Sequence, residues 1–318
     1  MRPSPRQAAA LLRSVRPAVR CRGASQPTQL LFPRRLSTTL PQSASPGPSS
    51  SSVNATEISH FSALASSWWD PHGPSRPLHL MNPLRHDFIR ACISSSSSPS
   101  ASPAAHLHPH SPPDQLHYLD IGCGGGIFAE SAARLPTTAS VTAIDPSPAI
   151  LAVARAHAKR DPSLRQKLRY LEETVESLPL PAPAPAGGAG GPGGGGYDVV
   201  SVFEVVEHVD HPARFLDRVG EFVRPGGWLV MSTIARTWTS WVVTNLVAED
   251  LLGVVPKGTH DWAKYVNVEE LEAYFRGKGG RWGDIRVMGV VYVPGLGWRE
   301  VKGGEKVGNY FLGVQRAD

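Results

Sequence analysis

Residues 122–126, Gly-Cys-Gly-Gly-Gly, constrain the fold of this chain more than any other segment. The residues before them, 117–121, have the character of a short buried strand, and residues 127–133 have the pattern of a helix. Glycines at such a junction let a ligand approach the backbone, and the first helical turn points its N–H groups at that ligand. The segment therefore predicts a ligand site at a strand–helix turn.

The spacing of these glycines narrows the kind of ligand. A dinucleotide-binding turn requires G-x-G-x-x-G, but the third of those glycine positions is Ile127. The pattern present is acid-x-G-x-G-x-G, beginning at Asp120. A second predicted strand ends in Asp145, where a carboxylate can bind both hydroxyls of a ribose. The turn favours a nucleoside that carries an amino acid; a Rossmann-like domain with another nucleotide, or with none, is the alternative.

Strand and helix patterns alternate along the rest of the chain, after a helical pattern that begins at Thr56. This alternation predicts an α/β fold with a doubly wound, Rossmann-like sheet in a single domain. Ligands of such sheets lie beyond the carboxyl ends of the strands, where the glycine turn, Asp145 and Glu204 all fall. The predicted strands are 118–121, 141–144, 168–171, 199–203, 228–233, 284–293 and 309–315, and the predicted helices are 127–135, 147–160, 212–222 and 268–277.

Composition separates the first 56 residues from the remainder. They hold eight Arg, no Lys and no acidic residue, with an amphipathic pattern around residues 8–19. These features are typical of a mitochondrial transit peptide; a disordered basic tail is the alternative. The remainder holds 24 Lys and Arg against 27 Asp and Glu, so the formal charge of +5 does not indicate a nucleic-acid partner. The three cysteines are scattered, which suits a reducing compartment. The sequence contains no apolar run of 18 residues, so we expect no helix that spans a membrane.

Two low-complexity runs interrupt the predicted domain. Residues 94–113 are rich in Ser, Pro and His, and residues 179–196 are rich in Pro, Ala and Gly. Neither run can bury a core, so we expect disordered, solvated loops. The expected organisation is a leader and linker over 1–55, followed by one α/β domain over 56–316.

An acidic segment follows the fourth predicted strand. If the chain continues there as a helix, Glu204, Glu207 and His208 occupy positions i, i+3 and i+4 on one face. Two carboxylates and an imidazole at this spacing could hold a divalent cation. The alternatives are that His208 is a general base, or that the segment only packs beneath a ligand.

Further segments carry a resemblance to a known family. Residues 68–73 read Trp-Trp-Asp-Pro-His-Gly, residues 82–85 read Asn-Pro-Leu-Arg, and residues 255–262 read Val-Pro-Lys-Gly-Thr-His-Asp-Trp. Together with residues 120–126 and 204–209, they resemble the ubiquinone biosynthesis O-methyltransferase family of class I S-adenosylmethionine methyltransferases. The resemblance implies that residues 56–316 form an S-adenosylmethionine-dependent methyltransferase domain.

The resemblance implies a binding role for four residues. Arg85 would pair with the carboxylate of S-adenosylmethionine, for which a guanidinium fork is suited. Gly122 would line the methionine portion, Asp145 would bind the ribose hydroxyls, and Phe203 would contact the cofactor mainly through its backbone.

The resemblance also implies a divalent cation, Mg²⁺, bound by Glu204, Glu207 and His208. A phenol like that of Tyr has a pKa of about 10, and a cation beside a catechol oxygen would lower it. His208 could instead take the proton directly, so two roles compete for one imidazole.

The implied substrates are polyprenylated catechols, namely 3,4-dihydroxy-5-polyprenylbenzoate and the later demethylubiquinol intermediate. The implied location is the matrix side of the mitochondrial inner membrane, as a peripheral protein within a multi-protein ubiquinone-biosynthesis complex. Residues 237–255 are apolar and are expected to form a buried helix over the site, a lid that dips into the membrane, or both. Two other functions stay open: methylation of another small molecule, and a non-catalytic S-adenosylmethionine-binding subunit.

Overall fold

A computed structural model describes most of the predicted domain. All described residues belong to one compact unit, Ser37–Asp318. The predicted transit peptide, most of both low-complexity runs and the segments 237–255 and 255–262 lie outside the described residues. The described residues are 59, 62, 65–95, 115–182, 195–236, 265–293 and 295–317.

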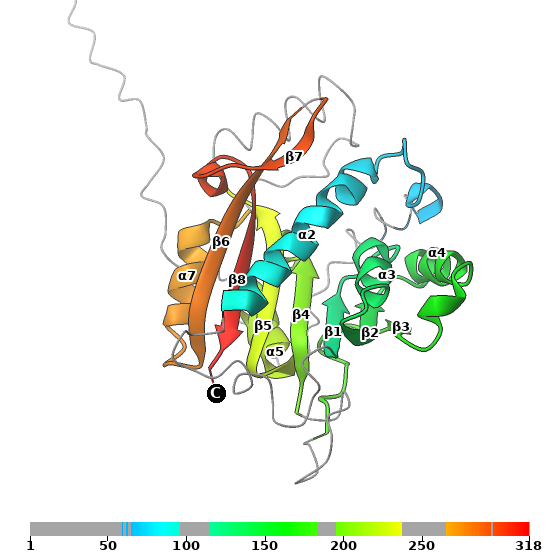
Figure 1. The fold of residues 1–318 in the computed structure, drawn as a ribbon. Coiled ribbons are helices and arrows are strands. Elements are labelled where there is room, and N and C mark those ends of the chain that lie inside the picture. Colours follow the sequence, from blue (N-terminus) through cyan, green and yellow to red (C-terminus); the bar gives the residue numbers. More distant parts are fainter. Residues whose placement is uncertain are drawn as a thin grey trace, which may run out of the picture. The chain divides into compact units, whose positions relative to one another are not determined.

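One eight-stranded sheet runs through the fold in the order β3-β2-β1-β4-β5-β8-β6-β7 (Figure 1). Strands β1 to β5 are parallel, and β8 lies antiparallel between β5 and β6. The strand order reverses between β1 and β4, which is where open α/β sheets bind ligands. The strands are β1 (Leu116–Ile121), β2 (Thr138–Asp145), β3 (Leu168–Glu172), β4 (Tyr197–Phe203), β5 (Val223–Ile234), β6 (Trp282–Val293), β7 (Gly297–Glu300) and β8 (Asn309–Arg316).

Helices cover both faces of this sheet, as the predicted doubly wound fold requires. Strand β4 is buried along its whole length, and successive side chains of a strand point to opposite faces. Val200 and Val202 pack with α5 and α7, whereas Val199 and Phe203 pack with α2 and α3. The helices are η1 (Ala65–Ser67), α2 (Arg76–Ser95), α3 (Ile127–Ala133), α4 (Pro148–Ala158), η2 (Pro162–Leu164), η3 (Val206–His208), α5 (Pro212–Phe222), α7 (Val268–Arg276) and η6 (Gly304–Lys306).

Helix α2 crosses the sheet diagonally in Figure 1 and brings a charged residue into the core. Its buried residues Met81, Arg85, Phe88, Ile89 and Cys92 recur at the three- and four-residue spacing of one helix face. Arg85 therefore lies in the middle of an apolar stripe that packs toward β5 and β8.

Helix α2 was not among the predicted helices, and β5 begins at Val223 rather than at residue 228. Two further places differ from the sequence-based expectation. Strand β7 was not predicted, because its four residues have no apolar alternation and, among the described strands, pair with the end of β6 alone. After β4, only the short 3-10 helix η3 forms, and Glu204 precedes it in a left-handed conformation with φ of 56°. The helix that would align Glu204, Glu207 and His208 on one face is therefore not formed.

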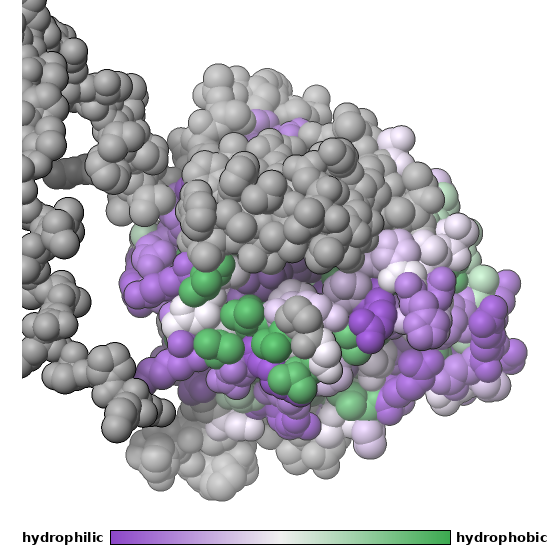
Figure 2. Space-filling model, turned by 90° about the horizontal axis from the view of Figure 1, so that it is seen from above, coloured by the Kyte–Doolittle hydropathy of each residue, from purple (hydrophilic) through white to green (hydrophobic). Residues whose placement is uncertain are grey.

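Figure 2 views the molecule from the side toward which β4 and β5 point in Figure 1. A group of apolar residues gathers there on a surface that is otherwise largely polar. Among the described residues, the exposed large apolar side chains include Leu80, Tyr292 and Leu296, the last being 62% exposed. No described helix combines the length and the apolar character needed to cross a bilayer.

Candidate active site

The glycine turn joins β1 to α3 and requires glycine for steric reasons. Gly122, Gly124 and Gly126 have φ values of 69°, 54° and 87°, a region that side-chain-bearing residues rarely adopt. A Cβ atom on Gly122 would also lie 2.5 Å from Val205 Cγ2. The N–H groups of Gly122 and Cys123 both donate to Ile144 O, at 2.9 and 3.0 Å, which ties the turn to β2.

Asp145, the last residue of β2, reaches back to this turn. Its Oδ2 accepts a hydrogen bond from Gly124 N at 3.0 Å, and its Oδ1 accepts one from Ser147 N at 2.9 Å. Burial raises the pKa of the Asp145 carboxyl, and these two N–H groups counteract the rise. Each carboxylate oxygen retains a further lone pair, so the group can still accept bonds from two hydroxyls.

Arg85 is 4% exposed, and its guanidinium Cζ lies 4.7 Å from the centroid of the Phe203 ring. Its Nε has no hydrogen-bond partner among the described residues. Burial lowers the pKa of Arg85, while the negative charges of Glu204 and Asp120 raise it. A buried guanidinium with an unmade hydrogen bond is costly, so this position suits an anionic ligand.

Asp120 stands in the motif but was given no role in the sequence analysis. Its Oδ1 accepts a hydrogen bond from Ser201 Oγ at 2.7 Å, and its Oδ2 has no partner among the described residues. Burial raises the pKa of Asp120 to about 7, against the lowering effects of Ser201 and Arg85. Asp120 Oδ2 is thus an acceptor and Arg85 Nε a donor without a partner among the described residues. The charges of the two side chains also shift each other's pKa.

Glu204 and Glu207 are each engaged by a hydroxyl of β5. Ser232 Oγ donates to Glu204 Oε1 at 2.6 Å, and Thr233 Oγ1 donates to Glu207 Oε2 at 2.9 Å. Burial, together with the charge of Glu204, raises the pKa of Glu207 to about 7, while the charge of His208 lowers it.

Four elements therefore meet at the carboxyl edge of the sheet with the predicted cofactor residues. They are α2 with Arg85, the end of β1 with Gly122, the end of β2 with Asp145, and the end of β4 with Phe203. A hollow of about 480 Å³ between α7, β6 and η6 contains none of these residues.

Comparison with known proteins points to one family. A family profile described as a methyltransferase domain matches residues 99–279. The mitochondrial ubiquinone biosynthesis O-methyltransferase of Schizosaccharomyces pombe is 40% identical over 83% of this chain and 87% of its own. The mitochondrial enzyme of that name from Candida albicans is 37% identical over 83% and 86%, and the Rhodopseudomonas palustris enzyme is 37% identical over 75% and 85%.

The chain belongs to the ubiquinone biosynthesis O-methyltransferase family. The fold agrees, because the N-methyltransferase NodS of Bradyrhizobium japonicum, solved with S-adenosyl-L-homocysteine, superposes with a TM-score of 0.50. That match covers 83% of this chain and 98% of NodS at 14% identity. The predictions of the family, of the fold class and of an S-adenosylmethionine-dependent O-methyltransferase of ubiquinone biosynthesis are confirmed.

The cation predicted for this ubiquinone biosynthesis O-methyltransferase does not fit the described geometry. Two carboxylates and an imidazole are chemically suitable ligands. However, Glu204 lies outside the short helix that carries Glu207 and His208, so the three side chains do not share one helix face. Within the described parts of the chain, no three His, Cys, Asp or Glu side chains are grouped to hold a metal.

The Trp-Trp pair was used only as a family signature, yet it contacts the glycine turn directly. A Cβ atom on Gly124 would lie 2.5 Å from Trp68 Cζ2, and one on Gly125 would overlap the same ring. Trp69 Nε1 donates to Gly125 O at 2.9 Å. The adjacent glycines Gly124 and Gly125 and the adjacent tryptophans Trp68 and Trp69 were the sequence features that could have indicated this contact. A flat aromatic ring can pack closely on backbone that carries no side chains.

Proposed function

We propose that this protein transfers the methyl group of S-adenosylmethionine to catechol hydroxyls of two polyprenylated intermediates of ubiquinone biosynthesis. These are 3,4-dihydroxy-5-polyprenylbenzoate and the later demethylubiquinol. The names of the relatives support the pathway. The observation that carries the cofactor site is the buried Arg85, whose Nε lacks a partner among the described residues.

The chemistry of the site suits the amino-acid end of the cofactor. The guanidinium of Arg85 would bind the carboxylate, and the unsatisfied Oδ2 of Asp120 would accept a bond from the ammonium group. Gly122 would allow the methionine chain to approach the backbone, and Asp145 would bind the ribose hydroxyls. Phe203 would border the cofactor and hold Arg85 through its ring.

The sulfonium group of the cofactor supplies a good leaving group for an in-line displacement by the catechol oxygen. The protein therefore has two tasks, which are to position the reactants and to remove the phenol proton. His208 follows the same strand as Phe203 and is the imidazole that we assign as the general base. We derive no step through a metal, and the Mg²⁺ site at Glu204, Glu207 and His208 stays a prediction from the family resemblance.

We further propose that the protein acts at the matrix side of the mitochondrial inner membrane, as a peripheral member of a multi-protein complex. The Arg-rich, acid-free leader supports the mitochondrial location, as do the names of the fungal relatives. The apolar segment 237–255 would collect the prenylated substrate from the membrane. The apolar group in Figure 2 supports a membrane contact on this side of the molecule.

Methyl transfer from labelled S-adenosylmethionine to a short-prenyl dihydroxybenzoate tests the proposed reaction. The full chain is assayed with a chelator and with added Mg²⁺, beside an Arg85→Ala variant. We expect turnover that the variant loses. Restoration by Mg²⁺ after chelation would support the cation, whereas turnover indifferent to chelation would leave His208 as a metal-independent base. Cofactor binding without any turnover would favour another acceptor or a non-catalytic role.

A further inference from the structure

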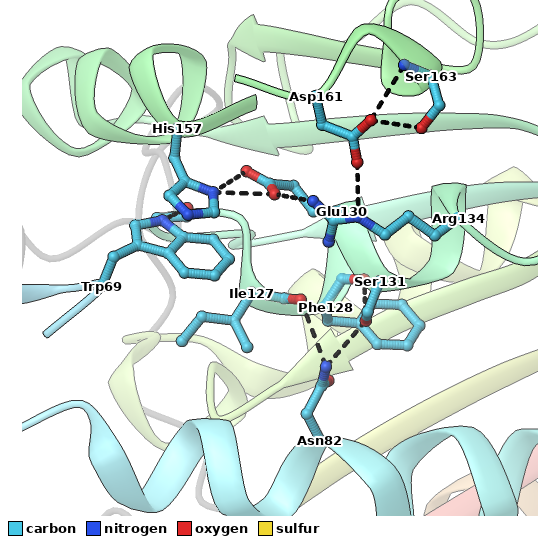
Figure 3. Close-up of polar contacts among 11 residues, drawn as sticks. Trp69, Asn82, Ile127, Phe128, Glu130, Ser131, Arg134, His157, Asp161 and Ser163 are labelled. Atoms are coloured by element: carbon cyan, nitrogen blue, oxygen red, sulfur yellow. Dashed lines mark hydrogen bonds and ion pairs between the residues drawn. The ribbon is translucent and has the colours of Figure 1, made fainter. Parts of the chain in front are cut away.

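Glu130 is a buried carboxylate that the proposed reaction does not use. It lies on α3, one turn after the glycine turn, and its side chain has no exposed area. Arg134 Nη2 donates to it at 2.8 Å, and the Nδ1 atom of His157 lies 2.9 Å from each of its carboxylate oxygens. Asp161 accepts from Arg134 Nε at 2.8 Å (Figure 3). A carboxylate at this depth is retained because donors surround it, and it fixes the orientation of those donors.

The consequence of this orientation is visible at His157, in the last turn of α4. The imidazole lies flat against the indole of Trp69, with ring centroids 3.4 Å apart and planes 5° apart. Trp69 in turn donates from Nε1 to Gly125 O. Glu130, His157 and Trp69, which we call the latch, thus connect a buried charge to the backbone of the glycine turn (Figure 3).

The latch also places the neighbouring tryptophan. Trp68 is 8% exposed and covers Gly124 and Gly125, packing beside Ile127. His79 joins the two tryptophans, because its Nε2 lies 2.9 Å from Trp68 O and its ring meets the Trp69 ring edge-on at 5.2 Å. Fixing Trp69 on Gly125 therefore fixes Trp68 over the turn.

We propose that Glu130 and His157 are positioning residues for S-adenosylmethionine, which act through Trp69 to hold Trp68 over the glycine turn. The inference rests on the proposed function, which puts the methionine end of the cofactor at this turn. Without the latch, residues 68–69 would have to be ordered when the cofactor binds. The apparent Kd would then rise by the inverse of the ordered fraction. Neither residue would touch a reacting atom, so the rate at saturating cofactor should be kept.

Calorimetric titration of the full chain with S-adenosylmethionine tests this role, together with kcat, KM and Tm. We expect His157→Ala and Trp69→Phe each to raise Kd and KM for the cofactor about fivefold or more. The kcat at saturating cofactor should stay within about twofold of the wild type. His157→Ala removes the contacts with Glu130 and Trp69, and Trp69→Phe removes the hydrogen bond to Gly125 O. Because both variants interrupt the same chain of contacts, their fold-changes in Kd should not multiply in the double variant. Asp161→Asn is the matched control, because it alters the network beyond Arg134 but leaves His157 on Glu130.

Two results would overturn the inference. If the single variants lower the Tm but leave the Kd unchanged, the latch contributes to packing alone. If the fold-changes in Kd multiply in the double variant, His157 and Trp69 act independently. Trp69→Phe keeps an aromatic ring, so the test survives if His157→Ala fails to fold. If the wild-type chain did not bind S-adenosylmethionine, the proposed function would fail, whereas tight binding by wild type and variants alike would refute the inference alone.

Discussion

At the scale of single residues, Arg85 places a charged group at a core position, as the proposed cofactor site requires. The apolar face of α2 and the ring of Phe203 border its guanidinium, and its Nε has no hydrogen-bond partner among the described residues. A carboxylate ligand would make the missing hydrogen bond of Arg85, and the free energy of that bond would contribute to cofactor affinity. Arg90, on the same helix, is 73% exposed and pairs with the exposed Asp87.

Replacing Arg85 by Lys should weaken cofactor binding about 10- to 100-fold, because an ammonium offers no planar fork and loses the stacked contact with Phe203. The Kd for S-adenosylmethionine, measured by titration calorimetry, checks this expectation. Arg90→Lys is the matched control and should leave Kd unchanged. Equal Kd values for Arg85→Lys and wild type would remove Arg85 from the cofactor site.

Tyr170 has a buried hydroxyl to which the proposed reaction assigns no role. Its Oη lies against Gly126 and has no hydrogen-bond partner among the described residues. Tyr170→Phe should therefore raise the free energy of unfolding by about 1 kcal/mol, seen as a higher Tm. Tyr274 bonds to Ala213 O and Asp217, so Tyr274→Phe should lower the Tm. A Tm drop for both variants would mean that the Tyr170 hydroxyl is satisfied in solution.

At the scale of elements, α2 approaches the sheet closely because β8 presents a glycine beneath it. A Cβ atom on Gly313 would lie 2.7 Å from Cys92 Sγ and 3.3 Å from a Phe88 ring atom. Helix α2 also carries Arg85, so its distance from the sheet sets the position of the guanidinium. The packing of α2 against β8 therefore affects the shape of the proposed cofactor site.

Gly313→Ala should lower the free energy of unfolding by about 1–3 kcal/mol, since the added methyl overpacks this contact. It should also weaken cofactor binding by displacing α2. Adding Cys92→Ala removes the sulfur that the methyl meets, so the double variant should recover much of both losses. Urea unfolding and cofactor titration measure the two effects, and additive losses in the double variant would contradict this packing argument.

Elements with a regular apolar period could be predicted from the sequence, and irregular ones could not. Helix α5 has the predicted bounds of 212–222, because its apolar stripe repeats at helical spacing. Strand β7 is the second strand of a tight hairpin with β6, and its four residues have no apolar alternation that would reveal it. The left-handed Glu204 is set by its bonds to β5, which a local pattern does not contain. The cofactor residues named from the motifs and the family resemblance stay a prediction, whereas the partners of Asp120, Glu130 and Trp69 required the fold.

At the scale of the whole molecule, buried carboxyls should make stability depend on pH. An Asp in an unfolded chain ionises near pH 4, whereas burial raises the pKa of Asp120 to about 7. Between these values the folded state keeps a proton that the unfolded state has released. The free energy of unfolding should therefore fall as pH rises from about 4 to about 7.

Asp120→Asn should flatten this decline, by up to about 4 kcal/mol between pH 4 and pH 8, because the amide does not ionise. Urea unfolding at a series of pH values without cofactor measures the slope. Asp87→Asn, at an exposed position of α2, should retain the wild-type slope. An equally steep decline in Asp120→Asn would mean that Asp120 is ionised throughout this range.

The position of β8 has a consequence for how the protein is made. Among the described strands it is the last in the sequence, yet it lies between β5 and β6 and is the strand that joins them. Until residues 309–316 have been synthesised, no described strand links the hairpin of β6 and β7 to the parallel strands. A premature stop before Asn309 would leave two sheet fragments with open edges, a form prone to aggregation.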